Sequence, residues 1–480
     1  FIFRLFSSKD RMLMNLREVA TIIHLPSVGS DASRELKRSK ASVAPAPLDL
    51  PETGVLIGHN IYGGTETPVR IGNTDRMRHF YCIGQTGVGK TTLLKNMIIQ
   101  DIENGEGVCM IDPHGSDLLD VLSHVPSDRW DDVIYFDPAY TKRPMGLNML
   151  EYDPRYPEQK TFVVNEMMSI FNKLFDMKAT GGPMFEQYFR NATMLVIEDP
   201  ETGNTLFDVS RVMSEEAFRE LKLSRCKNPV VVQFWREVAE KAGGEAKLAN
   251  IVPYITSKFD VFLSNDIMRP IIIQKESAFN FRKIMDERKI LLVNLSKGRL
   301  GDINANLIGL IIVGKILMAA LSRVDMLGMK DIPNFFLYID EFQNITTDSI
   351  ATILSEARKY KLGLNIYHQY IKQLEEKIRD AVFGNVGTIC SYRVGTEDAE
   401  FLEKQFEPVF TANDLMNVDN FNMFIKTLVN NKTARPFSVR VPNTDKGNPE
   451  VLETLKELSY VRFGRPREDI EEEVARKYKI

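Results

Sequence analysis

The sequence predicts an α/β protein with a doubly wound, mainly parallel sheet that is interrupted by an inserted all-α domain. Short apolar runs alternate with helical patterns over residues 55–150, which is typical of parallel strands covered by helices. Over 151–285 the strand pattern stops, and apolar residues recur at spacings of three and four, as on the buried face of a helix. The alternation returns over 286–442, so one α/β domain is split by a helical insertion.

Seven apolar runs are the strand candidates of this sheet: HFYCIG, GVCMID and DVIYFDP before the insertion, then KILLVNLS, NFFLYIDE, GLNIYHQ and GTICSYRV after it. Helices are expected between them, namely one after Lys90, one over 117–123, a long one over 303–324 and two that end at Tyr360 and Ala381. Two later runs, FNMFIKTLV and PFSVRVP, predict an edge hairpin around Asn430.

The two ends of the chain complete the domain plan. Residues 1–54 predict an amphipathic helical segment followed by a linker, because ASVAPAPLDLPETG is rich in proline and small residues. Residues 443–480 predict a tail of two polar helices. A chain of 480 residues is too long for one simple core, so two or three domains are expected, one nested in another.

Composition limits the classes of function. With 61 basic and 65 acidic residues the formal charge is −4, which argues against a protein coated with nucleic acid over its whole surface and indicates that any such contact is local. The four cysteines have no CxxC spacing and are expected to be buried thiols in a reducing compartment. No uncharged apolar run approaches the roughly 20 residues that cross a bilayer. The chain begins with Phe1 rather than Met, so we expect a fragment or processed form of a longer protein and leave a preceding membrane segment open.

The run GQTGVGKT fits the pattern G-x-x-x-x-G-K-[ST] and stands between a strand candidate and a helix candidate. In such a loop, a P-loop, backbone N–H groups point at phosphate oxygens, and glycines are needed because a β-carbon would block the close approach. Lys90 would hold the β- and γ-phosphates of ATP, and Thr91 would hold Mg²⁺. The predicted nucleotide-binding residues are Gly84, Gln85, Thr86, Gly87, Val88, Gly89, Lys90, Thr91 and Thr92. A fortuitous glycine turn is the alternative, and the flanking strand and helix argue against it.

A P-loop needs a metal-side carboxylate at the end of a neighbouring buried strand. NFFLYIDEF supplies an apolar run that ends in Asp340 and Glu341. Asp340 would ligate Mg²⁺ through water, and Glu341 would polarise the attacking water. The alternative is a strand end followed by a solvated acidic helix start. An adjacent Asp-Glu pair favours hydrolysis over phosphoryl transfer to a metabolite.

Two further side chains are candidates for the same site. Gln369 closes the strand candidate GLNIYHQ, where a neutral amide could sense the γ-phosphate without competing for the metal. Arg358 lies at the end of a helix candidate and could stabilise transition-state charge in a neighbouring subunit, an effect worth about 10³ to 10⁵ in rate in other NTPases. Arg393 is the competing arginine, and a dipole partner at a helix end is the simpler interpretation of Arg358.

For nucleic acid, the basic candidates are Lys297 and Arg299, in a glycine-containing loop after a strand. Solvated loop charge is the alternative, and no aromatic and basic motif of a sequence-specific reader occurs.

The motif series GQTGVGKTTLL, IDPHG, LYIDEFQN, SEARKYKLGLNIYHQ and FGNVGTICSYRVGTEDAEFL resembles the FtsK/HerA superfamily of P-loop motors, and most of all the TraG/TraD-type coupling proteins of type IV secretion and conjugation. The resemblance covers roughly 55–441. It implies a RecA-like P-loop NTPase whose nucleotide-binding domain spans 55–150 and 286–442, with an all-α insertion that faces the cargo. Lys90, Thr91, Asp340, Glu341 and Gln369 match the family's Walker A, Walker B and sensor positions, and Arg358 matches the arginine eleven residues before the sensor.

The resemblance also implies an ATP- and Mg²⁺-dependent motor that assembles as a homohexamer, pumps DNA through a central channel without sequence preference and works with type IV secretion or conjugation partners. Such a protein is expected in the cytoplasm, with attachment at the cytoplasmic face of the membrane left open. The amino-terminal transmembrane pair of many coupling proteins is absent here. Three other functions stay open: a HerA-like DNA-processing translocase, a protein-secretion or assembly ATPase that does not engage DNA, and a structural nucleotide-binding ring.

Overall fold

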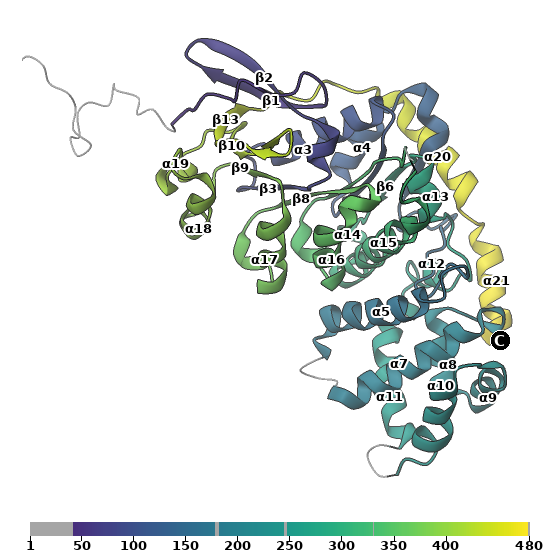
Figure 1. The fold of residues 1–480 in the computed structure, drawn as a ribbon. Coiled ribbons are helices and arrows are strands. Elements are labelled where there is room, and N and C mark those ends of the chain that lie inside the picture. The colour runs from purple at the N-terminus through teal and green to yellow at the C-terminus, as the bar shows by residue number, and fades with distance from the viewer. Residues whose placement is uncertain (1–41, 178–181, 244–246, 330, 479–480) are drawn as a thin grey trace, which may run out of the picture. The chain divides into compact units, whose positions relative to one another are not determined.

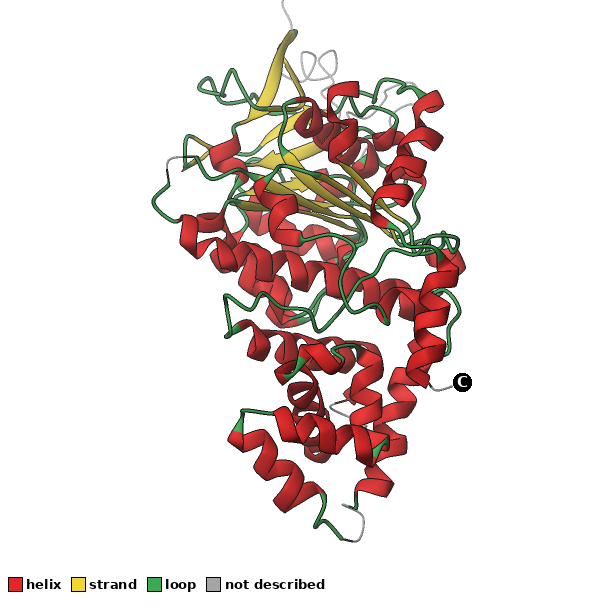
Figure 2. Ribbon diagram, turned by 90° about the vertical axis from the view of Figure 1, so that its right-hand side faces the viewer, coloured by secondary structure: helices red, strands yellow, loops and turns green. Residues whose placement is uncertain are grey.

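The structure is a computed structural model that describes residues 42–177, 182–243, 247–329 and 331–478. The amphipathic helix expected within residues 1–30 lies outside them. Within the described residues, eleven strands form one central sheet in the order β2-β1-β13-β10-β9-β3-β8-β7-β4-β6-β5 (Figure 1). Helices flank the strands on both faces (Figure 2), which confirms the predicted doubly wound α/β class.

All seven predicted strand runs lie side by side and pair in parallel, in the second part of that order. They are β9 (Thr388–Ser391), β3 (Phe80–Ile83), β8 (Leu362–His368), β7 (Phe335–Ile339), β4 (Gly107–Asp112), β6 (Ile290–Asn294) and β5 (Val133–Phe136). Every residue of these strands is buried. Helices cover both faces of a parallel sheet, which is why these strands carry continuous apolar runs rather than alternating ones.

The remaining strands of the sheet are antiparallel: β10 (Asn422–Lys426), β13 (Phe437–Arg440), β1 (Val55–Tyr62) and β2 (Thr65–Ile71). The predicted pairing of FNMFIKTLV with PFSVRVP is present as β10 and β13, but its placement at the sheet edge was wrong. A hairpin of β1 and β2 adds to β13 and takes the edge instead. Its signal in the sequence is Gly63-Gly64, which adopt φ of +58° and +80° and form the turn. A separate two-stranded hairpin pairs β11 (Leu428–Val429) with β12 (Lys432–Thr433).

The helices of the α/β part are α2 (Asn73–Arg76), α3 (Lys90–Glu103), α4 (Ser116–Leu122), α13 (Phe281–Asp286), α14 (Lys297–Leu300), α15 (Asp302–Ser322), α16 (Asp348–Glu356), α17 (Glu376–Asn385), α18 (Thr396–Phe406) and α19 (Ala412–Met416), followed by the tail helices α20 (Leu452–Phe463) and α21 (Arg467–Tyr478). In Figure 1, α3, α4 and α20 lie on one face of the sheet, and α13, α15 and α16 lie on the other. The 3-10 and π segments are η2 (Ser127–Asp132), η3 (Pro200–Thr202), η4 (Phe234–Ala239), η6 (Arg323–Met326), η7 (Phe342–Ile345), η8 (Ala357–Tyr360), η9 (Ile371–Gln373) and η10 (Pro449–Val451).

Between β5 and β6 the described elements are all helical. The α-helices before α13 are α5 (Gln159–Phe175), α7 (Gly182–Glu198), α8 (Leu206–Ser214), α9 (Glu216–Arg225), α10 (Pro229–Gln233), α11 (Leu248–Leu263) and α12 (Arg269–Ile272). Phe171 of α5 packs against Phe189 of α7 and Phe259 of α11, with ring centroids 5.2 and 5.4 Å apart. On the other side of α5, the Glu166 carboxylate accepts hydrogen bonds from Thr347 and Ser349 at the start of α16. The helical segment is therefore tied to the chain that follows β7.

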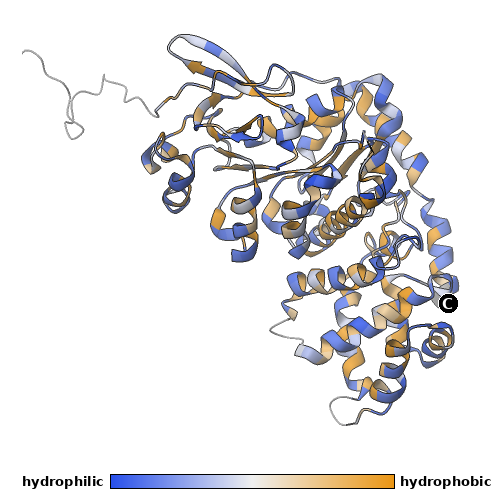
Figure 3. Ribbon diagram, viewed as in Figure 1, coloured by the Kyte–Doolittle hydropathy of each residue, from blue (hydrophilic) through white to orange (hydrophobic). Residues whose placement is uncertain are grey.

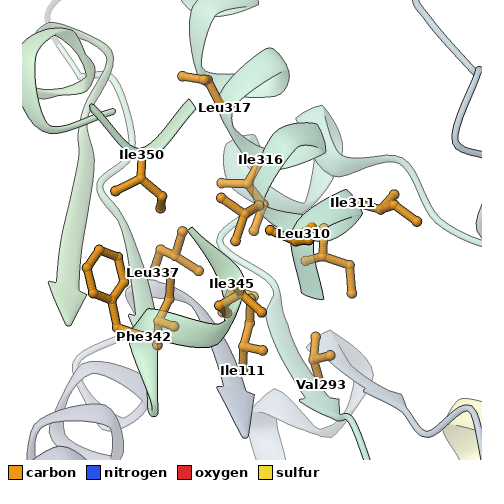
Figure 4. Close-up of a cluster of buried hydrophobic side chains, with 14 of the residues drawn as sticks. Ile111, Val293, Leu310, Ile311, Ile316, Leu317, Leu337, Phe342, Ile345 and Ile350 are labelled. Atoms are coloured by element: carbon orange, nitrogen blue, oxygen red, sulfur yellow. The ribbon is translucent and has the colours of Figure 1, made fainter. Parts of the chain in front are cut away.

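The core of the α/β part lies between the sheet and α15, an apolar helix that is coloured orange along most of its length in Figure 3. Figure 4 shows Ile111 and Leu337 of the strands facing this helix, together with Ile345 of η7. A β-carbon at Gly309 of α15 would lie 2.6 Å from Ile345 Cγ2, so the glycine allows the turn after β7 to approach closely. The segment Asp302–Met326 has the length and composition of a membrane span, but 83% of its apolar window is buried inside the protein.

A buried ion pair joins α2 to α3. The Arg76 guanidinium donates to both carboxylate oxygens of Asp101, at 2.6 and 2.7 Å, and to the Tyr338 hydroxyl at 2.7 Å. It also lies 3.8 Å from the centre of the Phe336 ring. Burial alone would lower the pKa of Arg76, but the Asp101 charge outweighs it and raises that pKa.

We expect Asp101→Asn to lower the free energy of unfolding by about 3–5 kcal/mol, because it leaves a buried guanidinium without a counter-charge. Urea unfolding followed by circular dichroism measures the change. The matched control is Asp131→Asn, which removes an exposed partner of Arg462 and should change stability little. Equal stability of Asp101→Asn and wild type would mean that the buried pair contributes nothing net.

Candidate nucleotide site

The order of the strands brings the predicted site residues together at the carboxyl ends of neighbouring parallel strands. β3, β8 and β7 are consecutive neighbours and run parallel, so their carboxyl ends meet. The glycine-rich loop follows β3, Gln369 follows β8, and Asp340 with Glu341 follows β7. Ligands of open parallel sheets bind in the crevice at such strand ends.

The glycine-rich loop has the geometry of a phosphate cradle. A β-carbon at Gly84 would lie 2.6 Å from Tyr392 Cβ, and Gly87 and Gly89 adopt φ of +77° and +115°, where glycine is favoured. Lys90, the first residue of α3, is buried, and its Nζ donates to the Gly84 and Gln85 carbonyl oxygens at 2.6 and 2.9 Å. The loop therefore curls around the lysine.

In the part of the chain that the structure describes, the backbone N–H groups of residues 87–91 donate no hydrogen bond to another group. They lie at the amino-terminal end of the 14-residue helix α3, where the helix dipole favours negative charge. Free donors, a favourable dipole and a buried lysine fit the polyphosphate of a nucleotide.

A chain of hydrogen bonds connects this loop to the acidic pair. Thr86 Oγ1 donates to Gln369 Oε1 at 3.2 Å, and Gln369 Nε2 donates to Glu341 Oε1 at 2.7 Å. The other carboxylate oxygen, Glu341 Oε2, accepts from Gln343 Nε2 at 2.6 Å. Two amides thus fix the carboxylate of Glu341, whose backbone has a positive φ of 48°.

The charges beside the loop also affect one another. Burial, the neighbouring Glu341 and Asp112 raise the pKa of Asp340 to about 7. Burial lowers the pKa of Lys90, against the raising effect of nearby Cys82, Asp340 and Glu341. Burial is the largest cause of both shifts, because it disfavours the charged form of each group. A polyphosphate beside Lys90 and a divalent cation beside Asp340 would each favour the charged form.

Within the described residues, no group of three or more His, Cys, Asp and Glu side chains lies ready to hold a metal ion. A site built from Thr91, Asp340 and nucleotide oxygens fits Mg²⁺, which takes one or two protein ligands together with phosphates and water.

The two candidate arginines lie in different surroundings. Arg393 is half-buried beside the loop, where its Nε donates to Gln85 Oε1 at 3.2 Å and its Nη2 donates to Asn420 Oδ1 at 3.1 Å. Arg358 is exposed in η8 and donates to Asn431 Oδ1 at 3.3 Å. No hydrogen bond or ion pair in the described residues joins Arg358 to the loop of its own chain. Arg393 therefore contacts the glycine-rich loop of its own chain, and Arg358 contacts a different segment.

The segment proposed for nucleic-acid contact, with Lys297 and Arg299, forms the short helix α14 rather than the expected loop. Lys297 pairs with Asp302 at 3.0 Å, and Arg299 is exposed.

Three residues of the site were missed by sequence reasoning. Gln343 holds Glu341, the Tyr392 hydroxyl donates to the Gly89 carbonyl oxygen at 3.1 Å, and Phe421 lies against Gly89. Gln343 and Tyr392 stand beside residues that were singled out, in IDEFQN and SYRV, and that proximity was the available signal. Phe421 opens the run FNMFIKTLV, which predicts only a strand and does not point to the site.

Comparison with known proteins finds a matching family model and structures of similar fold. The family model described as "Helicase HerA, central domain" matches residues 55–124, which include the glycine-rich loop. No curated protein sequence matches the chain.

Among solved structures, the plasmid coupling protein TrwB with a non-hydrolysable GTP analogue is similar at TM-score 0.58 and 15% identity, covering 79% of this chain and 89% of that one. TrwB in complex with ADP and Mg²⁺ is similar at TM-score 0.57 and 16% identity, covering 79% of this chain and 88% of that one. VirB4 of Thermoanaerobacter pseudethanolicus is similar at TM-score 0.55 and 13% identity, covering 83% and 99%. These likenesses concern the fold, and with the family model they confirm the resemblance predicted from the motif series.

Proposed function

We propose that this chain, an FtsK/HerA-type P-loop protein in fold and motifs, hydrolyses ATP and couples hydrolysis to the movement of DNA. The observation that carries the proposal is the hydrogen-bond chain from Thr86 through Gln369 to Glu341. It joins the phosphate cradle to the carboxylate that would act on water, so a change at the γ-phosphate reaches the catalytic group directly.

Each side chain has a distinct role in this proposal. Lys90 leaves its two carbonyl partners and neutralises charge on the β- and γ-phosphates. Glu341, oriented by two amides, accepts hydrogen bonding from the attacking water and draws its proton. Gln369 positions that water or reports loss of the γ-phosphate. Thr91 and Asp340 would hold Mg²⁺, which when bound would supply charge stabilisation to the phosphate oxygens.

The structural neighbours support a broader class of function than DNA movement, namely a type IV secretion-related ATPase. TrwB is a bacterial conjugative coupling protein, and we extend that role to this chain as a proposal. A homohexamer in the cytoplasm, working with secretion or conjugation partners at the cytoplasmic face of the membrane, follows from the same proposal. Arg358 is exposed and hydrogen-bonds to Asn431 rather than to the glycine-rich loop, which supports a ring in which one subunit completes the site of the next.

A second candidate is a secretion ATPase that moves protein and does not engage DNA, and the fold shared with VirB4 is compatible with it. Its turnover would respond to a protein partner rather than to DNA. A HerA-like DNA-processing translocase belongs to the first class, and a structural nucleotide ring would show slow turnover that ignores changes at Glu341.

We expect single- or double-stranded DNA to raise steady-state ATP hydrolysis at low salt. Lys90→Ala should abolish turnover with or without DNA, because it removes the phosphate ligand. If about 6 to 10 phosphates are contacted, DNA affinity should fall by about 10³ to 10⁵ between 50 and 200 mM salt and should not depend on sequence. Robust hydrolysis that DNA does not change would favour the protein-secretion ATPase, and a strong preference for one duplex sequence would contradict the channel.

A further inference from the structure

An exposed aromatic side chain lies beside the phosphate cradle. Phe421 is 39% exposed, although most phenylalanines of the described chain are buried. Its Cδ1 lies 3.1 Å from the position a Gly89 β-carbon would take. The ring therefore lies against the cradle and is partly exposed.

The backbone holds this ring in place from two sides. The Phe421 N–H donates to the Val88 carbonyl oxygen, and its own carbonyl oxygen accepts from the Val441 N–H, both at 2.8 Å. Phe421 has a φ of +60°, a conformation that a bulky side chain rarely adopts. The preceding residue, Asn420, is bonded to Arg393, which in turn donates to Gln85 of the cradle. The backbone that carries the ring is thus held against the loop.

The strand order gives the direction in which a bound nucleotide would extend. The sheet runs β10-β9-β3-β8-β7 here. Glu341 and Gln369 lie at the β7 and β8 ends, so the γ-phosphate belongs on that side of the P-loop, which follows β3. The rest of the nucleotide extends the opposite way, over β9 and β10. Phe421 immediately precedes β10 and lies on that side.

We propose that Phe421 is the platform on which the purine base of the bound nucleotide stacks. This inference rests on the proposed nucleotide site and adds a base subsite to it. Stacking senses the face of the ring system and not its hydrogen-bonding edge, so ADP and GDP should both depend on Phe421. The side chain contributes binding and does not take part in the chemistry.

The test compares ADP with pyrophosphate, which has the phosphates but no base, by titration calorimetry of the full chain in Mg²⁺. Phe421→Ala should weaken ADP binding by about 5- to 150-fold, the range of a lost base stack, and leave pyrophosphate binding unchanged. Phe421→Leu keeps apolar packing on Gly89 without an aromatic face and should also lose ADP affinity. Phe421→Trp should retain it, and ADP but not pyrophosphate should quench the new tryptophan.

Phe401→Ala is the matched control, because Phe401 is 37% exposed and packs against Phe383 instead of the cradle. It should change neither affinity.

Unchanged ADP affinity in Phe421→Ala, or an equal loss for ADP and pyrophosphate, would overturn the base subsite, the second outcome indicating a collapsed loop. An altered oligomeric state with unchanged ADP affinity would assign the ring to a subunit contact instead. Failure of wild type to bind either ligand would overturn the proposed function itself, whereas Phe421-dependent ADP binding without ATP hydrolysis would overturn only hydrolysis.

Discussion

Glu341→Gln should lower ATP turnover by about 10² to 10⁴ while ATP still binds. The loss follows from removing the base that draws a proton from the attacking water, a contribution of that size in general acid–base catalysis. Lys90 and the free N–H groups of the loop remain, so the polyphosphate keeps its ligands. Steady-state hydrolysis measures turnover, and titration with a non-hydrolysable ATP analogue measures binding.

The geometry around Glu341 makes this variant informative about mechanism. Both carboxylate oxygens accept from amides, Gln369 at 2.7 Å and Gln343 at 2.6 Å. The side chain of Glu341→Gln has one acceptor oxygen, so it can accept a hydrogen bond from only one of these two amides. Its own NH₂ group then faces the other amide. Part of the loss will therefore be misorientation, and Gln343→Ala should report that part alone by a smaller fall in turnover.

The control for charge removal is Glu356→Gln. Glu356 is exposed, and its one ion pair within the described residues is with Lys359. It should leave turnover unchanged. Turnover of Glu341→Gln equal to wild type would remove Glu341 from the chemistry and support the structural nucleotide ring.

The sequence was informative where one physical requirement determines the residues. Strands covered on both faces must be apolar throughout, so runs such as KILLVNLS and NFFLYIDE could be recognised individually. A phosphate cradle needs glycine at fixed positions, so the loop at 84–91 could be located to the residue. The β1 and β2 hairpin was missed because VLIGHNIY and TETPVRI carry few consecutive apolar residues, and only Gly63-Gly64 marks it.

Contacts between distant segments could not be read in the same way. Gln369 lies next to Glu341 only because β8 inserts between β3 and β7, and strand order is not written in any one run. Phe421 lies against Gly89 although the two residues are more than 300 positions apart in the sequence. These positions depend on tertiary packing, whereas the motif series depends on local chemistry.

Arg358→Ala should reduce turnover by about 10³ to 10⁵ with little loss of nucleotide binding, because an arginine finger acts on transition-state charge. Its side chain is exposed and makes one hydrogen bond of 3.3 Å, to Asn431. Because a single hydrogen bond holds it, we expect the guanidinium to reach the active site of a neighbouring subunit in the assembled ring. Arg393, by contrast, is held by Gln85, Val418 and Asn420 of its own chain.

Mixing inactive variants separates these two roles. Rings of Arg358→Ala lack the finger everywhere, and rings of Lys90→Ala lack the phosphate ligand everywhere. In a mixed ring, an Arg358→Ala subunit beside a Lys90→Ala neighbour combines an intact Lys90 with an intact Arg358. At equal amounts and random order this restores about one quarter of the sites of a closed homo-oligomer. Arg393→Ala mixed with Lys90→Ala should regain nothing, because both losses fall in the same subunit's site. Regained activity for the Arg393 mixture but not for the Arg358 mixture would reverse the assignment, and full activity of Arg358→Ala alone would leave that arginine as a partner of the helix dipole.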